Sequence, residues 1–223
     1  MTNHNGTNKE IVYDKVSVLT LFKDFWFRVP SYQRPYVWGD EQIDELFEDL
    51  RYAMEHAPGK EYFLGSAVLQ KNNVTEDGIT FTCHDLLDGQ QRLTTLFLLM
   101  AVLRDAAQDA LLQKKADEAI WRPADPFENH PERTRIDFEI RDEVAQFIDE
   151  RIKASGATND AATFDHLSKT SGSPSVVNMA KAVLCLKGHL NDLDQDALKS
   201  FAMFLFQRVV FIYVSTEELE DAF

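Results

Sequence analysis

The segment Leu93–Leu103 constrains the fold more than any other part of the chain. Its sequence, LTTLFLLMAVL, places apolar side chains on every side of a helix. Helices of this kind are buried all round, so we expect this one at the centre of the core. It is too short for the roughly 20 residues that cross a bilayer. With 44% apolar residues, the 223-residue chain can enclose it in a globular core.

Two segments that favour β-structure precede this helix. Phe63–Gln70 is a short apolar run, and Ile79–Leu87 is rich in residues that favour strands. The polar stretch between them ends in Asp77-Gly78, a turn signal typical of hairpins. The sequence therefore predicts an antiparallel hairpin whose second strand leads into the buried helix.

The rest of the chain favours both strands and helices, and we predict an α+β fold with a mixed sheet. A polar loop is expected over Ser155–Ser175. The β-branched run Val209–Val214 predicts a strand that is buried on both faces. The other expected elements are a strand and a short helix ending near Phe27, a helix capped by Asp40, and helices over 141–153, 176–192 and 197–207.

Charge and cysteine content exclude several classes of protein. A net charge of −14 without a basic run opposes binding of a phosphate backbone over the whole surface. Cys83 and Cys185 are too few for a disulfide framework or a four-cysteine zinc site, and the absence of HxxxH and CxxC spacings argues against a structural metal. The polar N-terminus has no secretory segment, so we expect a cytoplasmic protein without a membrane partner.

The C-terminal residues favour a helix that is cut short. Ser215–Glu218 has the Ser-x-x-Glu form of a capping box, which predicts a helix start. The sequence stops soon afterwards at Phe223, before that helix can bury an apolar face. We therefore expect a fragment of a longer protein.

The junction Asp88–Arg92, DGQQR, is the strongest candidate for a ligand site. The first amides of a helix lack internal acceptors and carry about half a positive charge, so anions bind there. Gly89 permits a tight turn, and Arg92 can contact a phosphate bidentately. Asp88 can hold Mg²⁺ or a water, and the two glutamines can orient that water or bind a base edge. The alternative is a solvated first helical turn capped by Asp88.

The aromatic-rich segment Tyr32–Trp38, YQRPYVW, is the second candidate. Arg34 lies among aromatic rings, an arrangement suited to stacking on a nucleotide base and neutralising a phosphate. Alternatively, the rings belong to the core beside a helix start, and Arg34 pairs with one of the acids of residues 40–49.

His84 and Asp85 come directly before the junction, on the second predicted strand. They are either an acid–base pair or part of a partly exposed strand. Because side chains alternate along a strand, the two residues are expected to face opposite sides.

Three segments together resemble a known family. YQRPYVW, FLGSAVL and DLLDGQQRLTTLFLLMAVLR are similar to the N-terminal domain of GmrSD-type, modification-dependent restriction proteins. The resemblance continues weakly through Arg135–Arg141 and Phe211–Phe223, and so spans nearly the whole chain. Members usually continue into an Asn-x-Arg-Gly segment and often a His-Asn-His nuclease domain. This sequence has neither, in line with the fragment expected above.

The resemblance implies a ParB/sulfiredoxin-like core that binds and hydrolyses a nucleoside triphosphate, with Mg²⁺ as the expected cofactor. It implies a nucleotide-binding core at 1–115, a helical region at 116–207, and a returning strand with the start of a truncated helix at 208–223. The implied partners are a nuclease domain in cis or in trans, DNA through the full-length protein, and a second copy of the chain in a homodimer.

By the same resemblance we assign Asp88, Gln91 and Arg92 to catalysis, with Asp88 also as the metal ligand. Two other functions fit the residues: non-hydrolytic sensing of a nucleotide or of modified DNA, and a dimerisation scaffold. The residues expected to bind the nucleotide are Gln33, Arg34, Tyr36, Trp38, Gly89, Gln90 and Thr94.

Overall fold

Helix α3 (Gln90–Ala106) occupies the centre of the core, as its sequence predicts. Every residue from Leu93 to Arg104 is buried. Helices α4 (Ala110–Glu118) and α7 (Pro174–Asn191) pack against it. Burial on all sides follows from the sequence, since this helix has no polar face. The structure is a computed structural model that describes residues 12–76, 78–128, 130–139 and 142–216.

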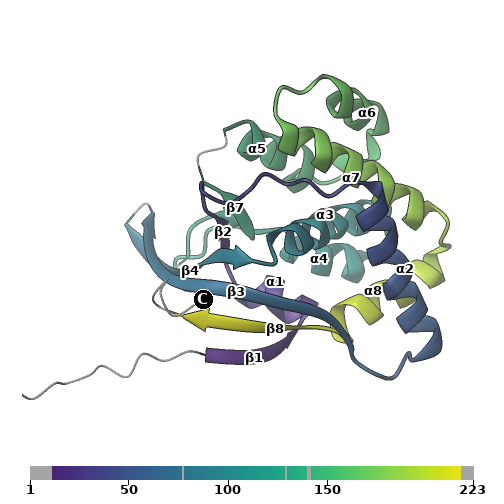
Figure 1. The fold of residues 1–223 in the computed structure, drawn as a ribbon, viewed down its shortest axis with the longest axis horizontal. Helices are drawn as coiled ribbons and strands as arrows, with labels where there is room; N and C mark the ends of the chain where they lie inside the picture. The colour runs from purple at the N-terminus through teal and green to yellow at the C-terminus, as the bar shows by residue number, and fades with distance from the viewer. Residues whose placement is uncertain (1–11, 77, 129, 140–141, 217–223) are drawn as a thin grey trace, which may run out of the picture.

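A six-stranded mixed sheet draws strands from both ends of the described chain (Figure 1). The predicted hairpin is confirmed, because its two strands, β3 and β4, pair antiparallel. On the other side of β3, β8 lies parallel to it. The order across the sheet is β1 (Val12–Ser17), β8 (Val209–Thr216), β3 (Tyr62–Glu76), β4 (Ile79–Asp88), β2 (Phe27–Val29) and β7 (Ile136–Phe138).

Helices gather to one side of the sheet in Figure 1, and the mixture of sheet and helices confirms the α+β class. In the described part of the chain, no helix has the length and apolar character needed to cross a membrane. The remaining elements are α1 (Val18–Asp24), α2 (Asp40–His56), β5 (Trp121–Arg122), β6 (Arg133–Thr134), α5 (Asp142–Phe147), a π-helical turn (Ile148–Lys153), a 3-10 turn (Ala157–Asn159), α6 (Ala161–Thr170) and α8 (Gln195–Gln207).

Tertiary pairing corrects two predictions near the N-terminus. Helix α1 ends at Asp24 rather than near Phe27, because Phe27 joins β2 and donates its amide hydrogen to the carbonyl of Arg135 at 2.9 Å. The Phe27 side chain is fully buried. At α2, Gly39 rather than Asp40 holds the cap position, and Asp40 is the first helical residue, where the helix dipole favours an acid.

The loop predicted over 155–175 is wrong in its middle, where α6 forms. Asp160 caps this helix by accepting a hydrogen bond from the amide of Thr163 at 3.1 Å, and the ring of Phe164 is fully buried. A side-chain cap and one buried ring stabilise the helix. No apolar run marks it in the sequence, because only one residue of the helix is buried.

Strand β8 is buried only in part, contrary to the prediction of two buried faces. Phe211 is fully buried, whereas Ile212, which points to the opposite face, is 40% exposed. The helices therefore cover only one face of the sheet at this strand. Ser215 pairs with Leu69 as part of β8 and is not a helix cap. The remainder of the predicted capping box lies in residues 217–223, outside the described part.

His84 lies on β4 in an apolar environment. Its ring centre is 4.8 Å from that of Phe25, and its Nδ1 is buried without a hydrogen-bond partner among the described residues. Burial lowers the pKa of His84 to about 4. The charge of Lys71 also lowers this pKa, while a hydrogen bond to the Trp26 backbone and the charge of Asp85 oppose the shift. The folded protein therefore keeps His84 neutral.

We predict that the protein loses stability through His84 as the pH falls from about 6.5 to about 4. The unfolded histidine binds a proton below about pH 6.5, whereas the folded one stays neutral, so protons favour the unfolded state. The loss is about 3 kcal/mol at most over this range. Urea unfolding at several pH values measures it.

The His84→Phe variant should show a flatter dependence of unfolding free energy on pH above pH 5, where few carboxylates titrate. The control is His166→Ala, which removes an exposed histidine on α6 and should keep the wild-type slope. Equal slopes for the wild type and His84→Phe would contradict the prediction.

Candidate functional site

Gly89 forms the corner at which β4 ends and α3 begins. Its φ is +85°, a left-handed conformation that favours glycine. A Cβ at this position would lie 3.1 Å from the backbone oxygen of Ser66 and 3.3 Å from the Cα of Ala67. The absence of a side chain therefore permits the turn and also brings the start of α3 against β3.

A pocket of about 360 Å³ lies in front of this corner. It brings the two predicted segments together, since the DGQQR junction forms one wall and the segment 33–38 forms another. Ser66 and Leu87 complete the lining. The predicted site residues that line it are Gln33, Arg34, Trp38, Asp88, Gly89, Gln90, Gln91 and Arg92.

Tyr36 and Thr94 were predicted to bind the nucleotide, but they do not line the pocket. Each is 2% exposed. The hydroxyl of Tyr36 lies 2.8 Å from that of Thr95 within the core, and burial raises the pKa of Tyr36. The buried Tyr36 side chain therefore fastens the segment 33–38 to α3 through Thr95.

The two glutamines of the junction hold the segment 33–38 in place. Gln91 accepts a hydrogen bond from the amide of Val37 at 2.8 Å and donates one to the carbonyl of Pro35 at 3.1 Å. Gln90 donates to the carbonyl of Arg34 at 2.8 Å. The side-chain amide of Gln91 is therefore already bound at both ends, which assigns it to positioning the wall of the pocket.

The other end of the Gln90 side chain is unsatisfied. Gln90 is 7% exposed and lines the pocket, and its Oε1 is buried without a donor among the described residues. A buried acceptor without a partner costs about 1–3 kcal/mol. A hydrogen-bond donor on a ligand would remove this cost.

Arg92 holds its guanidinium against β3 at a place that only glycine leaves open. A Cβ on Gly65 would lie 2.2 Å from Nη1 of Arg92. Arg92 makes no hydrogen bond or ion pair with the described residues, and the first turn of α3 has no acidic residue and no side-chain cap. The helix dipole and the guanidinium, neither paired with a described side chain, therefore place about half a positive charge and one full positive charge at one corner.

Two exposed charged residues flank this corner. Asp88 ends β4, and Arg34 lies on the opposite segment. Neither side chain has a hydrogen bond or ion pair within the ranges described. The alternative in which Arg34 pairs with an acid of residues 40–49 is therefore not observed there. The alternative in which Asp88 caps α3 is also wrong, because Gly89 holds the cap position.

Gly65 and Ser66 are functional candidates that sequence reasoning missed. Gly65 interrupts the apolar strand segment FLGSAVL, and a glycine inside a strand often marks a close approach of another group. The sequence therefore offered a signal at Gly65. It did not show that the approaching group is Arg92, because Arg92 lies on a different element, α3.

His84 and Asp85 do not join this site. Asp85 accepts two hydrogen bonds from Arg28, at 2.7 and 2.8 Å, and one from Asn72 at 2.9 Å. His84 packs on Phe25. Asp85 is therefore a satisfied structural carboxylate, and the two residues do not form an acid–base pair.

Comparison with protein families matches residues 18–223 to the family described as GmrSD restriction endonuclease, N-terminal domain. No curated protein matches the chain. The family match includes both walls of the pocket and almost the whole sheet. It agrees with the resemblance drawn from the YQRPYVW and DGQQR segments, and the chain belongs to the GmrSD restriction endonuclease N-terminal domain family.

Proposed function

We propose that the pocket binds a nucleoside triphosphate and that the chain hydrolyses it as the nucleotide-dependent module of a restriction endonuclease. The observation that carries this proposal is the unpaired guanidinium of Arg92 beside the uncapped start of α3. Two positive groups converging on a polar pocket favour a ligand with several negative charges. A polyphosphate supplies these charges in a compact form.

The phosphates would lie on the first amides of α3, which have no acceptor inside the helix. Arg92 would donate two hydrogen bonds to one phosphate, and Arg34 would neutralise charge from the facing wall. Phosphoryl transfer depends mainly on such positioning and charge stabilisation. The pocket therefore offers binding groups suited to that reaction.

The same pocket offers groups suited to a base. Trp38 lines the pocket and packs on the core from its other side. An aromatic ring held in this way can stack on a nucleotide base. The unsatisfied Oε1 of Gln90 can accept a hydrogen bond from a base amino or imino group.

Asp88 fits the expected Mg²⁺ ion. Mg²⁺ at nucleotide sites is held by one or two carboxylates together with substrate phosphates and water. Asp88 is the one carboxylate that lines the pocket among the described residues, and it has no other partner there. When bound, the ion would supply charge neutralisation at the phosphates. Asp88 would be the protein ligand that holds it.

The family suggests the setting in which this module works. We propose a partner nuclease domain, in cis or in trans, and contact with DNA through the longer protein, because a chain with net charge −14 is a poor binder of a phosphate backbone. A cytoplasmic location and a homodimer belong to the same proposal.

Non-hydrolytic sensing is the second candidate, and one observation favours it. Both ends of the Gln91 amide are bound to the segment 33–38. It is therefore not free to align an attacking water, and Asp88 would have to do this alone. Calorimetry with each ribonucleoside triphosphate and Mg²⁺, beside a phosphate-release assay, separates the two functions. Binding without release supports sensing.

We predict that Arg92→Ala weakens binding of the triphosphate about 10- to 100-fold and abolishes its hydrolysis. The reason is the loss of a charged hydrogen bond, which contributes about 1.5–3 kcal/mol. Calorimetry and phosphate release measure both effects. Arg51→Ala, on the exposed surface of α2, removes the same charge elsewhere and should match the wild type. Normal turnover by Arg92→Ala would refute the assignment.

We predict that Gly65→Ala weakens binding of the triphosphate about 10-fold, because the new Cβ would displace the Arg92 guanidinium. The control is Gly78→Ala, another glycine with a positive φ, +79° against +141° at Gly65, but with open space where its Cβ would lie. Both substitutions place a side chain on a backbone conformation that favours glycine and should lower stability in urea, but only Gly65→Ala should lose affinity. Equal affinities for the two variants would contradict the prediction.

We predict that Asp88→Asn keeps binding of the triphosphate in the absence of Mg²⁺ and loses the Mg²⁺-dependent part of both binding and hydrolysis. The substitution preserves shape and removes the charge that would hold the ion. Titration of the nucleotide with and without MgCl₂ gives this comparison. An unchanged response to Mg²⁺ would remove Asp88 from the metal site.

A further inference from the structure

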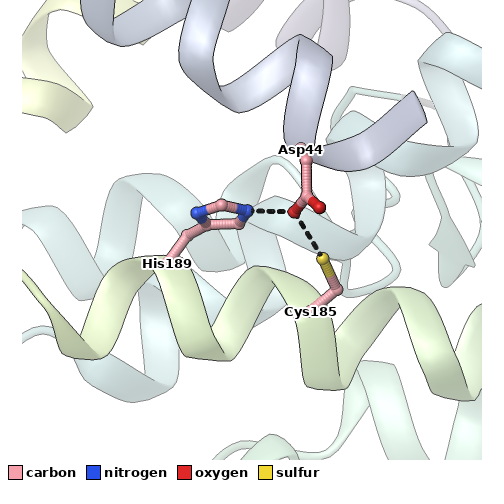
Figure 2. A group of neighbouring side chains, drawn as sticks. All are labelled: Asp44, Cys185 and His189. Atoms are coloured by element: carbon pink, nitrogen blue, oxygen red, sulfur yellow. Dashed lines mark hydrogen bonds and ion pairs between the residues drawn. The ribbon is translucent and has the colours of Figure 1, made fainter. Parts of the chain in front are cut away.

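Three potential metal donors converge between α2 and α7, away from the pocket described above (Figure 2). Asp44 lies near the start of α2, while Cys185 and His189 lie four residues apart on α7. Residues at this spacing share one face of a helix. Figure 2 shows the thiol and the imidazole of α7 both directed at the carboxylate of α2.

The donor atoms are already close to a metal-binding arrangement. Nε2 of His189 lies 2.6 Å from Oδ1 of Asp44, and Sγ of Cys185 donates to the same oxygen at 3.2 Å. All three donor atoms lie within 4.8 Å of one another. A tetrahedral ion with bonds of about 2.0–2.3 Å needs ligand atoms roughly 3.3–3.8 Å apart. Small side-chain shifts would therefore admit it.

A second feature fixes the imidazole in this position. The ring of His189 stacks on that of Phe47, with centres 4.5 Å apart and planes within 15°. Phe47 follows Asp44 by three residues on α2 and lies on the same face. One helix thus supplies a ligand and a platform for the opposing ligand. Such preorganisation lowers the entropy lost on binding.

The site is accessible to an ion from solvent. The side chain of Asp44 is 48% exposed and that of His189 is 23% exposed. Water can therefore occupy a fourth coordination position. Hydrogen bonds from His189 and Cys185 lower the pKa of Asp44, and burial together with Asp44 raises the pKa of Cys185 to about 12. The carboxylate is therefore ionised and the thiol protonated without metal.

We infer that Asp44, Cys185 and His189 bind Zn²⁺, with water as the fourth ligand. A thiolate, an imidazole and a carboxylate form a ligand set suited to Zn²⁺, whereas Mg²⁺ and Ca²⁺ prefer oxygen alone. On binding, the thiol proton passes to solvent. The proton that Nε2 of His189 donates to Asp44 leaves that nitrogen, and the neutral ring then carries its proton on Nδ1. Sγ of Cys185, Nε2 of His189 and a carboxylate oxygen of Asp44 form the bonds to the ion.

The bound ion would fasten α2 to α7. These helices contact each other, and α7 also holds the segment 33–38, where Ser175 accepts a hydrogen bond from the amide of Tyr36 and Asn178 donates to its carbonyl. Zn²⁺ would therefore stabilise the support of the pocket wall without touching the nucleotide site. This role stands whether or not the pocket hydrolyses a nucleotide.

Metal binding to the whole chain tests the inference. Zn²⁺ titration by calorimetry should give one ion per chain, and Co²⁺ should give a thiolate-to-metal charge-transfer band, which reports a sulfur ligand. Cys185→Ala should remove that band and weaken Zn²⁺ binding more than about 100-fold, beyond the loss that a supporting group causes. Zn²⁺ should also raise the melting temperature of the wild type.

Two further variants serve as controls, one for misfolding and one for Zn²⁺ binding at a different cluster. Asp44→Asn keeps the shape of the side chain and should weaken Zn²⁺ binding with an unchanged circular dichroism spectrum. Glu128→Gln alters the cluster Asp125, Glu128 and His130, which contains no sulfur, and should bind like the wild type. No Zn²⁺ binding by the wild type, or binding by Cys185→Ala or Asp44→Asn as tight as that of the wild type, would overturn the inference.

Discussion

Helix α3 has no polar face, so its burial determines how the rest of the chain is arranged. Helices α4 and α7 pack against it, and its side chains share one hydrophobic core with the sheet. Only its ends are available for polar chemistry. The start of α3 opens into the pocket at Gly89, and its last turn contains Arg104, a buried cation. The helix therefore carries an arginine near each end, Arg92 and Arg104.

The arginines near the two ends of α3 differ in whether the protein supplies their partners. Arg104 is 3% exposed and donates to Asp105 at 2.7 Å, to Asp117 at 3.0 Å, and to the carbonyls of residues 152–154. It is fully satisfied by the protein. Arg92 at the other end has no such partner within the described chain. Because an unpaired cation beside a helix start attracts an anion, the contrast separates a structural arginine from one that is available to a ligand.

The sequence predicted the two walls of the pocket but not how they are joined. DGQQR and YQRPYVW were recognisable as polar and aromatic groups suited to phosphate and base. The contacts of Gln91 and Tyr36 were not recognisable from the sequence. An amide or a hydroxyl can bind either a ligand or another group of the protein, and only the fold shows that these two bond within the protein. The partners Asp44 and His189 lie on separate helices that only the fold brings together.

The sequence by itself determined the local elements: the hairpin, the buried helix, and a glycine corner between them, since apolar periodicity and turn chemistry act over a few residues. Only the tertiary structure decided the close approach of Arg92 to Gly65, the strand at Phe27, and the helix α6. These features depend on contacts between distant segments. The free energy that stabilises them comes from burial and strand pairing between distant segments, which a local sequence pattern does not predict.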